Sequence, residues 1–125
     1  MEKKYLKLND ITAYKNAFNL SNFVWKIVSR WDILNQKTLG EQFVRATDSI
    51  PANIAEGFGR YQKKDKIRFY RISFGSILES FDWNEKANRR NLLKRKEYEY
   101  IFEELKKLPK ELNHLTSFTN DKLSI

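Results

Sequence analysis

Apolar residues recur every three to four positions through most of this chain, which is the spacing of amphipathic helices. Asp10 precedes the first such stretch and is a candidate N-cap, since its carboxylate can accept hydrogen bonds from unpaired backbone amides. The pattern predicts a first helix over about residues 11–31. Its apolar positions are Ile11, Tyr14, Phe18, Val24, Ile27, Val28 and Trp31.

A second stretch has its apolar positions at Leu39, Phe43, Ala46, Ile50 and Ile54. This stripe keeps its phase through Pro51, which predicts one helix over about residues 38–57 instead of two. Proline has no amide hydrogen, so the Thr47 carbonyl loses its helical donor, at up to ~3 kcal/mol unless a nearby hydroxyl compensates. Gly57 and Gly59 are the expected end signals, because glycine accepts the left-handed conformation of a helix C-cap.

The third stretch predicts a helix over about residues 65–88, with apolar positions at Ile67, Tyr70, Phe74, Ile77, Leu78 and Phe81. Gly75 lies inside it, where glycine costs ~1 kcal/mol relative to alanine, so a close approach of another backbone is expected there. The fourth stretch predicts a helix over about residues 94–118, followed by a tail. Its positions Ile101, Leu105, Leu108, Leu112 and Leu115 alternate four and three apart, the spacing of a left-handed bundle.

Four helices with short connections pack as antiparallel neighbours, which predicts an all-α, up-down-up-down four-helix bundle. A chain of 125 residues is the size of one such domain, spanning residues 1–125. Four glycines and two prolines are too few turn residues for a many-stranded sheet. No segment approaches the ~20 apolar residues of a membrane span, and the N-terminus lacks the apolar run of a secretory signal. We therefore expect a cytoplasmic protein without a membrane partner.

A polar stripe runs beside the apolar stripe of the second helix. At ~100° per residue its members fall within roughly 80° of arc, centred about 105° from the apolar positions. A solvated helix edge with local ion pairs is one interpretation. An interface between subunits is the other, because short side chains let a partner helix approach and buried polar groups fix its register. The candidate oligomer-interface residues are Gln42, Arg45, Ser49, Asn53 and Glu56.

Side chains for catalysis or metal binding are scarce. The chain has no cysteine, which removes thiol nucleophiles and thiolate metal ligands. His114 is the only histidine, and one histidine without cysteine cannot form a usual zinc site. Ser49 and Glu56 are two helical turns apart, too far for the carboxylate to activate the hydroxyl. We expect no enzyme activity, no metal and no cofactor.

Positive charge is concentrated in one segment of the chain. The formal net charge is +8, and residues 60–96 contain 12 basic and 4 acidic residues, while the remainder contains 12 of each. The basic residues between the second and third helices are Arg60, Lys63, Lys64, Lys66, Arg68 and Arg71. Those between the third and fourth helices are Lys86, Arg89, Arg90, Lys94, Arg95 and Lys96.

In an up-down bundle these two junctions lie at opposite ends, ~35 Å apart at ~1.5 Å per residue. Clustered lysine and arginine side chains bind phosphates without reading bases, so the two clusters are candidate sites for sequence-independent binding of nucleic acid.

The second and third helices also resemble a known family. The segment "LGEQFVRATDSIPANIAEGFGR", followed by "FYRISFGSILES", resembles the four-helix bundle proteins encoded in intervening sequences of bacterial large-subunit ribosomal RNA genes. The family pattern is a Gln, then Arg-Ala, Ser-Ile-Pro, Asn-Ile-Ala-Glu-Gly and Arg, with Gly-Ser and Glu in the next helix. It falls here on Gln42, Arg45, Ala46, Ser49, Ile50, Pro51, residues 53–57, Arg60, Gly75, Ser76 and Glu79. After Glu79 the sequence departs from this pattern.

This resemblance implies a four-helix protomer that assembles into a ring-shaped homopentamer. The family is similar to the accessory variability protein of diversity-generating retroelements, thought to bind nucleic acid and a reverse transcriptase, so the similarity implies a nucleic-acid-processing partner of that kind. A ring would repeat each basic cluster around its axis. We therefore predict a non-catalytic, oligomeric scaffold that binds nucleic acid, with RNA as the first candidate. The alternative is a protein–protein interaction adaptor whose basic ends contact an acidic protein and which binds no nucleic acid.

Overall fold

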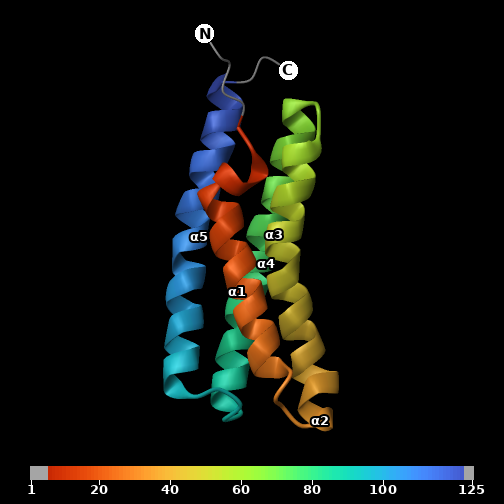
Figure 1. Cartoon of the computed structure of the whole chain (residues 1–125), viewed down its shortest axis with the longest axis vertical. Coiled ribbons are helices and arrows are strands. Elements are labelled where there is room, and N and C mark those ends of the chain that lie inside the picture. Colours follow the sequence, from red (N-terminus) through yellow and green to blue (C-terminus); the bar gives the residue numbers. More distant parts are fainter. Residues whose placement is uncertain (1–5, 123–125) are drawn as a thin grey trace.

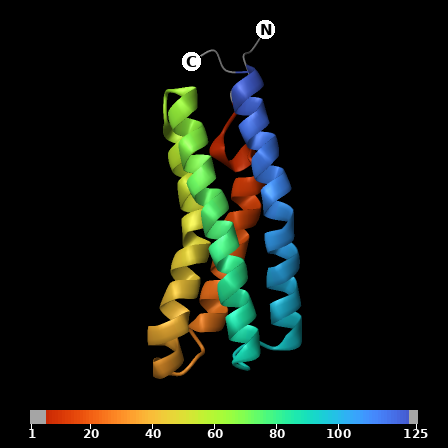
Figure 2. The ribbon, with the colours of Figure 1, turned by 180° about the vertical axis from the view of Figure 1, so that it is seen from behind.

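A computed structural model of the chain describes residues 6–122, and these form an antiparallel bundle of four long helices (Figures 1 and 2). The long helices are α1 (Thr12–Val28), α3 (Glu41–Gly59), α4 (Lys63–Arg89) and α5 (Arg95–Lys122). Each packs against two others, in the order α1, α3, α4, α5 and back to α1. The described residues contain no strand, and no helix among them is long and apolar enough to cross a membrane. The predicted all-α up-down bundle is confirmed.

Short helical segments precede α1 and α3. A single 3-10 turn, η1 (Leu8–Asp10), comes before α1, and α2 (Ile33–Asn35) continues through the π-helical segment η2 (Gln36–Gly40) into α3. The first helix ends at Val28, three residues earlier than its apolar pattern predicted. Trp31, the last member of that pattern, instead lies in the following turn, where its indole nitrogen donates to the Leu92 carbonyl, 3.0 Å away.

The α1–α2 turn is closed by side chains that cap exposed backbone groups. Asp32 accepts a hydrogen bond from the backbone nitrogen of Asn35 at 3.0 Å, which starts α2. The side-chain amide of Gln36 donates to the carbonyls of Val28 and Ser29, at the end of α1. Gly40 lies so close to α1 that a Cβ atom there would be 2.8 Å from Val28 Cγ1, so this position requires glycine.

The apolar stripes of α3 and α5 face the core as their spacing predicted. Leu39, Phe43, Ala46, Ile50 and Ile54 are all buried. So are the five α5 positions Ile101, Leu105, Leu108, Leu112 and Leu115. The helix α5 continues to Lys122, and Thr119 is buried there, so the predicted tail is wrong for residues 119–122. Residues 123–125 of that tail lie outside the described residues.

The buried face of α4 differs from its predicted apolar stripe. Phe74 and Leu78 are exposed, whereas Ser73, Ser76, Ser80 and Asn84 are buried. The reason is the close packing of α4 on α3, where small side chains occupy the contact. The Ser73 hydroxyl donates to the Ile50 carbonyl at 2.9 Å, so its polar group is satisfied inside the core.

Two glycines have the opposite of the roles that the sequence suggested. A Cβ atom built on Gly75 meets nothing within 4 Å, so the close backbone approach expected there does not occur within the chain. A Cβ on Gly57 would lie 2.7 Å from Tyr70 Cε1 and 2.9 Å from the Lys66 carbonyl oxygen. Gly57 is helical and buried rather than a C-cap. The helix ends at Gly59, the second expected end signal, although no glycine among the described residues has a positive φ. The close contact between α3 and α4 is therefore made at Gly57.

Pro51 lies inside α3 without ending it, which confirms the prediction of one helix. Pro51 is buried. The Ser73 hydroxyl of α4 donates to the carbonyl of the preceding residue, Ile50, and not to that of Thr47. The Thr47 hydroxyl itself donates to the carbonyls of Phe43 and Val44, one turn earlier.

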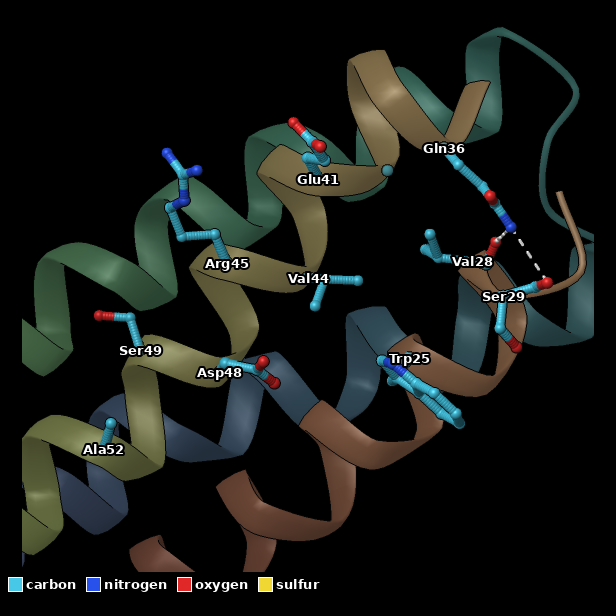
Figure 3. A pocket seen from close by; sticks show the side chains of 11 residues that line it. Trp25, Val28, Ser29, Gln36, Glu41, Val44, Arg45, Asp48, Ser49 and Ala52 are labelled. Atoms are coloured by element: carbon cyan, nitrogen blue, oxygen red, sulfur yellow. Dashed lines mark hydrogen bonds between the residues drawn. The ribbon is translucent and has the colours of Figure 1, made fainter. Parts of the chain in front are cut away.

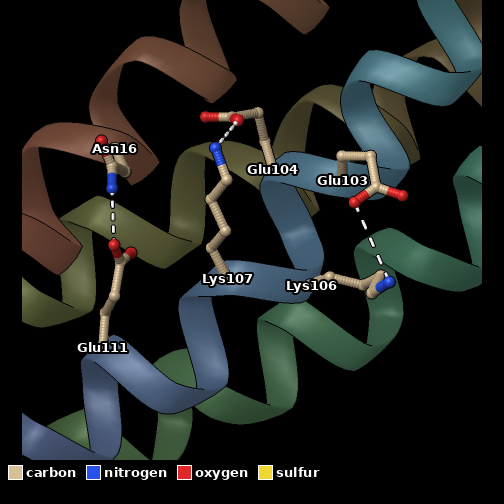
Figure 4. A network of polar contacts seen from close by, with 6 residues as sticks. All are labelled: Asn16, Glu103, Glu104, Lys106, Lys107 and Glu111. Carbon is tan, nitrogen blue, oxygen red and sulfur yellow. Dashed lines mark hydrogen bonds and ion pairs between the residues drawn. The ribbon is translucent and has the colours of Figure 1, made fainter.

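The contact between α1 and α5 contains a buried carboxylate (Figure 4). The side-chain amide of Asn16 donates to Glu111 Oε2 at 2.7 Å. The second oxygen of Glu111 is buried and has no hydrogen-bond partner among residues 6–122. Nearby lysines on α5 pair within their own helix, Lys107 with Glu104 and Lys106 with Glu103.

Candidate nucleic-acid interface

Two lysines of the basic cluster at the α3–α4 junction form hydrogen bonds to backbone carbonyls at the ends of helices. Lys66 Nζ donates to the Phe58 carbonyl at 2.7 Å, and Lys63 Nζ donates to the Asn120 carbonyl at 3.0 Å. These carbonyls belong to the last turns of α3 and α5, which lack donors of their own. Burial lowers the pKa of Lys66. Both lysines therefore act as C-caps, and phosphate binding would have to compete with those bonds.

The arginines of this cluster are held on aromatic rings. The guanidinium carbons of Arg60 and Arg68 lie 4.7 and 4.6 Å from the ring centroid of Phe69. Arg60 also pairs with Glu56, one turn earlier in α3. Lys64, Arg68 and Arg71 face the same side of α4 and border a surface recess of about 430 Å³. Asp65 borders the same recess and pairs with Arg68 at 3.9 Å, so Lys64 and Arg71 are the members of this group that form no ion pair within residues 6–122.

The basic cluster at the α4–α5 junction surrounds a short loop. Asn91 has a φ of 59°, a left-handed conformation that asparagine tolerates, and it turns the chain between the helices. Glu97 accepts a hydrogen bond from the backbone nitrogen of Lys94, which starts α5. Lys86 pairs with Asp82 at 2.7 Å, and Arg95 pairs with Glu99 at 2.9 Å.

The remaining four basic residues of this cluster form no ion pair within residues 6–122; they are Arg89, Arg90, Lys94 and Lys96. The bundle adds a further cation that sequence reasoning missed. Arg30, in the turn after α1, borders the same recess of about 250 Å³ as Lys94. An up-down bundle brings the first turn beside the third, so the topology predicted from sequence could have indicated this neighbour.

The predicted oligomer-interface residues fall into two groups. Ser49 and Asn53 are half-buried: the Ser49 hydroxyl oxygen accepts from Ser76 of α4 at 2.9 Å and from Asn53 at 2.8 Å. Gln42, Arg45 and Glu56 are exposed. The polar stripe therefore begins at the α3–α4 contact and continues onto the outer surface of α3.

An open groove lies between α1 and α3 (Figure 3). Its volume is about 800 Å³, and its apolar wall includes Val28, Val44 and Trp25, whose side chain is 57% exposed. Glu41 and Asp48 place carboxylates on the α3 side. Burial raises the pKa of Asp48 above its ordinary value, and a hydrogen bond from Ser21 opposes this shift. Two predicted interface residues, Arg45 and Ser49, also border this groove.

Among the described residues no group of three histidine, cysteine, aspartate or glutamate side chains is placed to hold a metal ion. His114 is exposed and borders a recess of about 510 Å³ between the start of α1 and the end of α5. That recess also contains Asp10, Lys110 and Glu111.

The fold and these surfaces define the class of protein: an antiparallel four-helix bundle with basic ends and a small-residue contact between α3 and α4. Residues 9–114 match the family model described as 23S rRNA-intervening sequence protein, and the chain belongs to this family. The family predicted from residues 39–60 and 69–80 is thus confirmed.

A solved structure shows the same fold. It is a crystal structure of a protein with unknown function from the S23 ribosomal protein family of Bacteroides thetaiotaomicron VPI-5482. It is 22% identical in sequence, the alignment covers 84% of this chain and 98% of that chain, and the TM-score is 0.73. No curated protein matches this chain.

Proposed function

We propose that this protein is a non-catalytic, oligomeric scaffold that binds nucleic acid through the basic ends of its bundle. The observation that supports this most directly is the α4–α5 end, where Arg89, Arg90 and Lys94 extend from one short loop and form no ion pair within residues 6–122. Unpaired cations in one place attract phosphates, and their binding releases counterions from the polyanion. The family description connects its members with ribosomal RNA, which favours RNA as the ligand.

Binding is expected to be independent of base sequence. The cations lie at helix ends and in a loop, and they contact phosphates as point charges without a helix that could enter a groove. A structured RNA and a matched duplex DNA should then bind with similar affinity, and the affinity should fall steeply with salt, by about 0.7–0.9 log units per decade of salt for each phosphate neutralised.

Charge reversal at the α4–α5 end tests this proposal. The double variant R89E/R90E should lose most of its affinity for a labelled RNA hairpin and should show a smaller salt slope. The control K15E/K110E changes the net charge equally, at two exposed lysines away from this loop, and should retain binding. An equal loss of RNA affinity in both double variants would show that net charge, and not the α4–α5 end, determines binding. No binding by the wild type at low salt would refute nucleic-acid binding.

Self-association is the second part of the proposal, and its support is a pair of uncovered surfaces. The α1–α3 groove is apolar with acidic groups at Glu41 and Asp48. The outer face of α4 has exposed Ile72 beside Arg68 and Arg71, and Gly75 leaves room for a close helix contact. Arg68 and Arg71 on the α4 face are opposite in charge to Glu41 and Asp48 in the groove, which favours contact between the two faces. Two different faces would meet in each contact, and such a contact gives a closed ring when its rotation divides a full turn evenly and an open filament when it does not.

A further inference from the structure

Two aliphatic side chains are unusually exposed at one end of the bundle. Ile33 is 68% exposed and Leu34 is 72% exposed, the highest values among the large aliphatic residues in the described range. Both belong to α2, the single helical turn at the end of the bundle where the α4–α5 loop also lies (Figure 1). An adjacent apolar pair at the tip of a molecule is a surface that a partner covers.

Exposed cations flank this apolar pair in the sequence. Arg30 precedes Ile33 by three residues and Lys37 follows Leu34 by three, and both are exposed. Arg30 also shares a recess with Lys94 of the α4–α5 loop. The one acidic residue in the turn, Asp32, uses its carboxylate oxygens to accept hydrogen bonds from Asn35. A ligand that covers this end must therefore offer negative charge and an apolar layer behind it.

Nucleic acid meets both requirements, because its bases lie behind its phosphates. The cations here include those that the proposed function assigns to phosphates, so a single ligand accounts for the charged and the apolar parts of the surface. Isoleucine and leucine are among the side chains that proteins insert between unstacked bases.

The shape of this end restricts which nucleic acid can be bound in this way. The Trp31 indole nitrogen is bonded to the Leu92 carbonyl, so the α1–α2 turn is tied to the α4–α5 loop and cannot extend alone. Two helix ends side by side are about 20 Å across, wider than either groove of B-DNA, and the major groove of an RNA helix is narrower still. The minor groove of an RNA helix is wide and shallow but exposes only base edges and 2′-hydroxyls, so the apolar pair can insert between bases only where their stacking is already interrupted.

We propose that Ile33 and Leu34 form an apolar wedge, and that this end of the bundle selects RNA helices interrupted by unpaired nucleotides, such as a bulge or an internal loop. This inference rests on the proposed function, since the surrounding cations supply the phosphate contacts. It assigns the two contributions to different residues: Arg30, Lys37 and Lys94 to affinity for any helix, and Ile33 with Leu34 to preference for the interrupted one.

The test compares two RNA hairpins that differ only in a two-nucleotide bulge, with 2-aminopurine next to the bulge. The wild type should bind the bulged hairpin about tenfold more tightly, which corresponds to ~1.4 kcal/mol, and the 2-aminopurine fluorescence should rise as the base unstacks. The variant I33S/L34S should bind both hairpins equally, at the wild-type affinity for the perfect stem and with an unchanged salt slope. The conservative variant I33M/L34M should keep the preference.

Equal binding of the two hairpins by the wild type, or a preference that survives in I33S/L34S, would overturn the wedge and leave the proposed function intact. Failure of the wild type to bind either hairpin would refute the proposed function itself. Two other results would assign the pair to a different partner and also overturn the wedge: binding to phosphatidylserine vesicles that is lost in I33S/L34S, or a smaller oligomer mass in that variant.

Discussion

The Ser76 hydroxyl of α4 donates to the Ser49 hydroxyl oxygen of α3, 2.9 Å away, in the contact where these two helices pack. Ser80 lies four residues further along α4; it is fully buried, and its hydroxyl donates to the Ser76 carbonyl. The contact therefore depends on small side chains as well as on their hydrogen bonds.

Enlarging a buried serine of α4 should destabilise the bundle. We expect Ser80→Leu to lower the free energy of unfolding by about 1–3 kcal/mol, because extra methylene groups in a closely packed core force side chains and backbone apart. Ser80→Ala removes the same hydroxyl without adding volume and should cost less. Urea unfolding followed by circular dichroism measures both, and equal losses would show that volume is not the limiting factor.

A glycine-to-alanine substitution should lower the stability of the protein at Gly57 but not at nearby Gly59. Gly57→Ala places a Cβ 2.7 Å from Tyr70 Cε1 and 2.9 Å from a backbone oxygen, which should destabilise the protein by about 1–3 kcal/mol. Gly59→Ala meets no atom within 4 Å and serves as the matched control. The midpoints of urea unfolding of the two variants measure this difference in stability. A Gly57→Ala protein as stable as Gly59→Ala would contradict the close contact between α3 and α4.

Gly75→Ala should stabilise the isolated protomer by about 0.5–1 kcal/mol, because alanine favours helix and the new Cβ meets no atom. The same substitution should weaken self-association if α4 approaches a neighbouring copy at this point. Unfolding measured at low concentration and sedimentation at high concentration separate the two effects. Unchanged sedimentation would remove Gly75 from the proposed contact between copies.

The carboxyl group of Asp48 should make stability depend on pH. Burial raises its pKa above the ordinary value of 3.8, so the folded state holds the proton more tightly than the unfolded state. The free energy of unfolding should then fall as the pH rises from 3.8 through the raised pKa of the folded state. Ionised Asp48 should therefore cost stability at pH 7. The side chain is largely exposed to water, so we expect this cost to be about 0.5 kcal/mol or less.

The variant Asp48→Asn isolates this effect. It should be slightly more stable than the wild type at pH 7, and the charge-dependent part of the difference should disappear below about pH 3, where Asp48 is protonated in both the folded and the unfolded state. Thermal unfolding across this range measures the difference. A gap that stays constant with pH would show that the carboxyl charge is not its cause.

Self-association through two different faces makes a distinctive prediction for mixtures. Ala52→Arg blocks the α1–α3 groove and Ile72→Asp disrupts the α4 face, and both residues are exposed, so the fold should persist. Each variant alone should be monomeric by sedimentation. An equimolar mixture should form a dimer, because one intact groove still meets one intact α4 face. Assembly of either variant alone would contradict this pairing, and Lys15→Glu is the surface control.

The sequence predicted the helices and their buried faces correctly where large apolar residues face the core. The spacing of Ile101, Leu105 and Leu108 indicated both the helix and its buried face, since burial of such side chains dominates helix packing. It misled at α4, where Phe74 and Leu78 continue an apolar pattern on the outer surface. A pattern of large residues cannot reveal a contact made by Ser73, Ser76 and Ser80, because small buried side chains look polar in sequence.

The sequence identified the basic residues of the candidate site, but not which of them are bonded within the protein or lie beside one another. The sequence could list Lys63 and Lys66 among the cations, but only the fold shows that both bind the last carbonyls of neighbouring helices. It could not connect Arg30 with Lys94, because they are 64 positions apart and meet only through the packing of two turns. The exposure of Ile33 and Leu34 was equally hidden, since an apolar pair near a helix start predicts burial.

The π-helical segment Gln36–Gly40 sets the orientation of the bundle tip relative to the core. A π turn contains about one residue more than an α turn, so α2 is rotated by about 100° from the direction it would have on a regular helix. Removing one residue from this segment would turn α2 relative to α3, and it would also displace Leu39 from the core and Gly40 from its contact with Val28. The orientation of the tip is therefore fixed by the same contacts that hold α1 and α3 together.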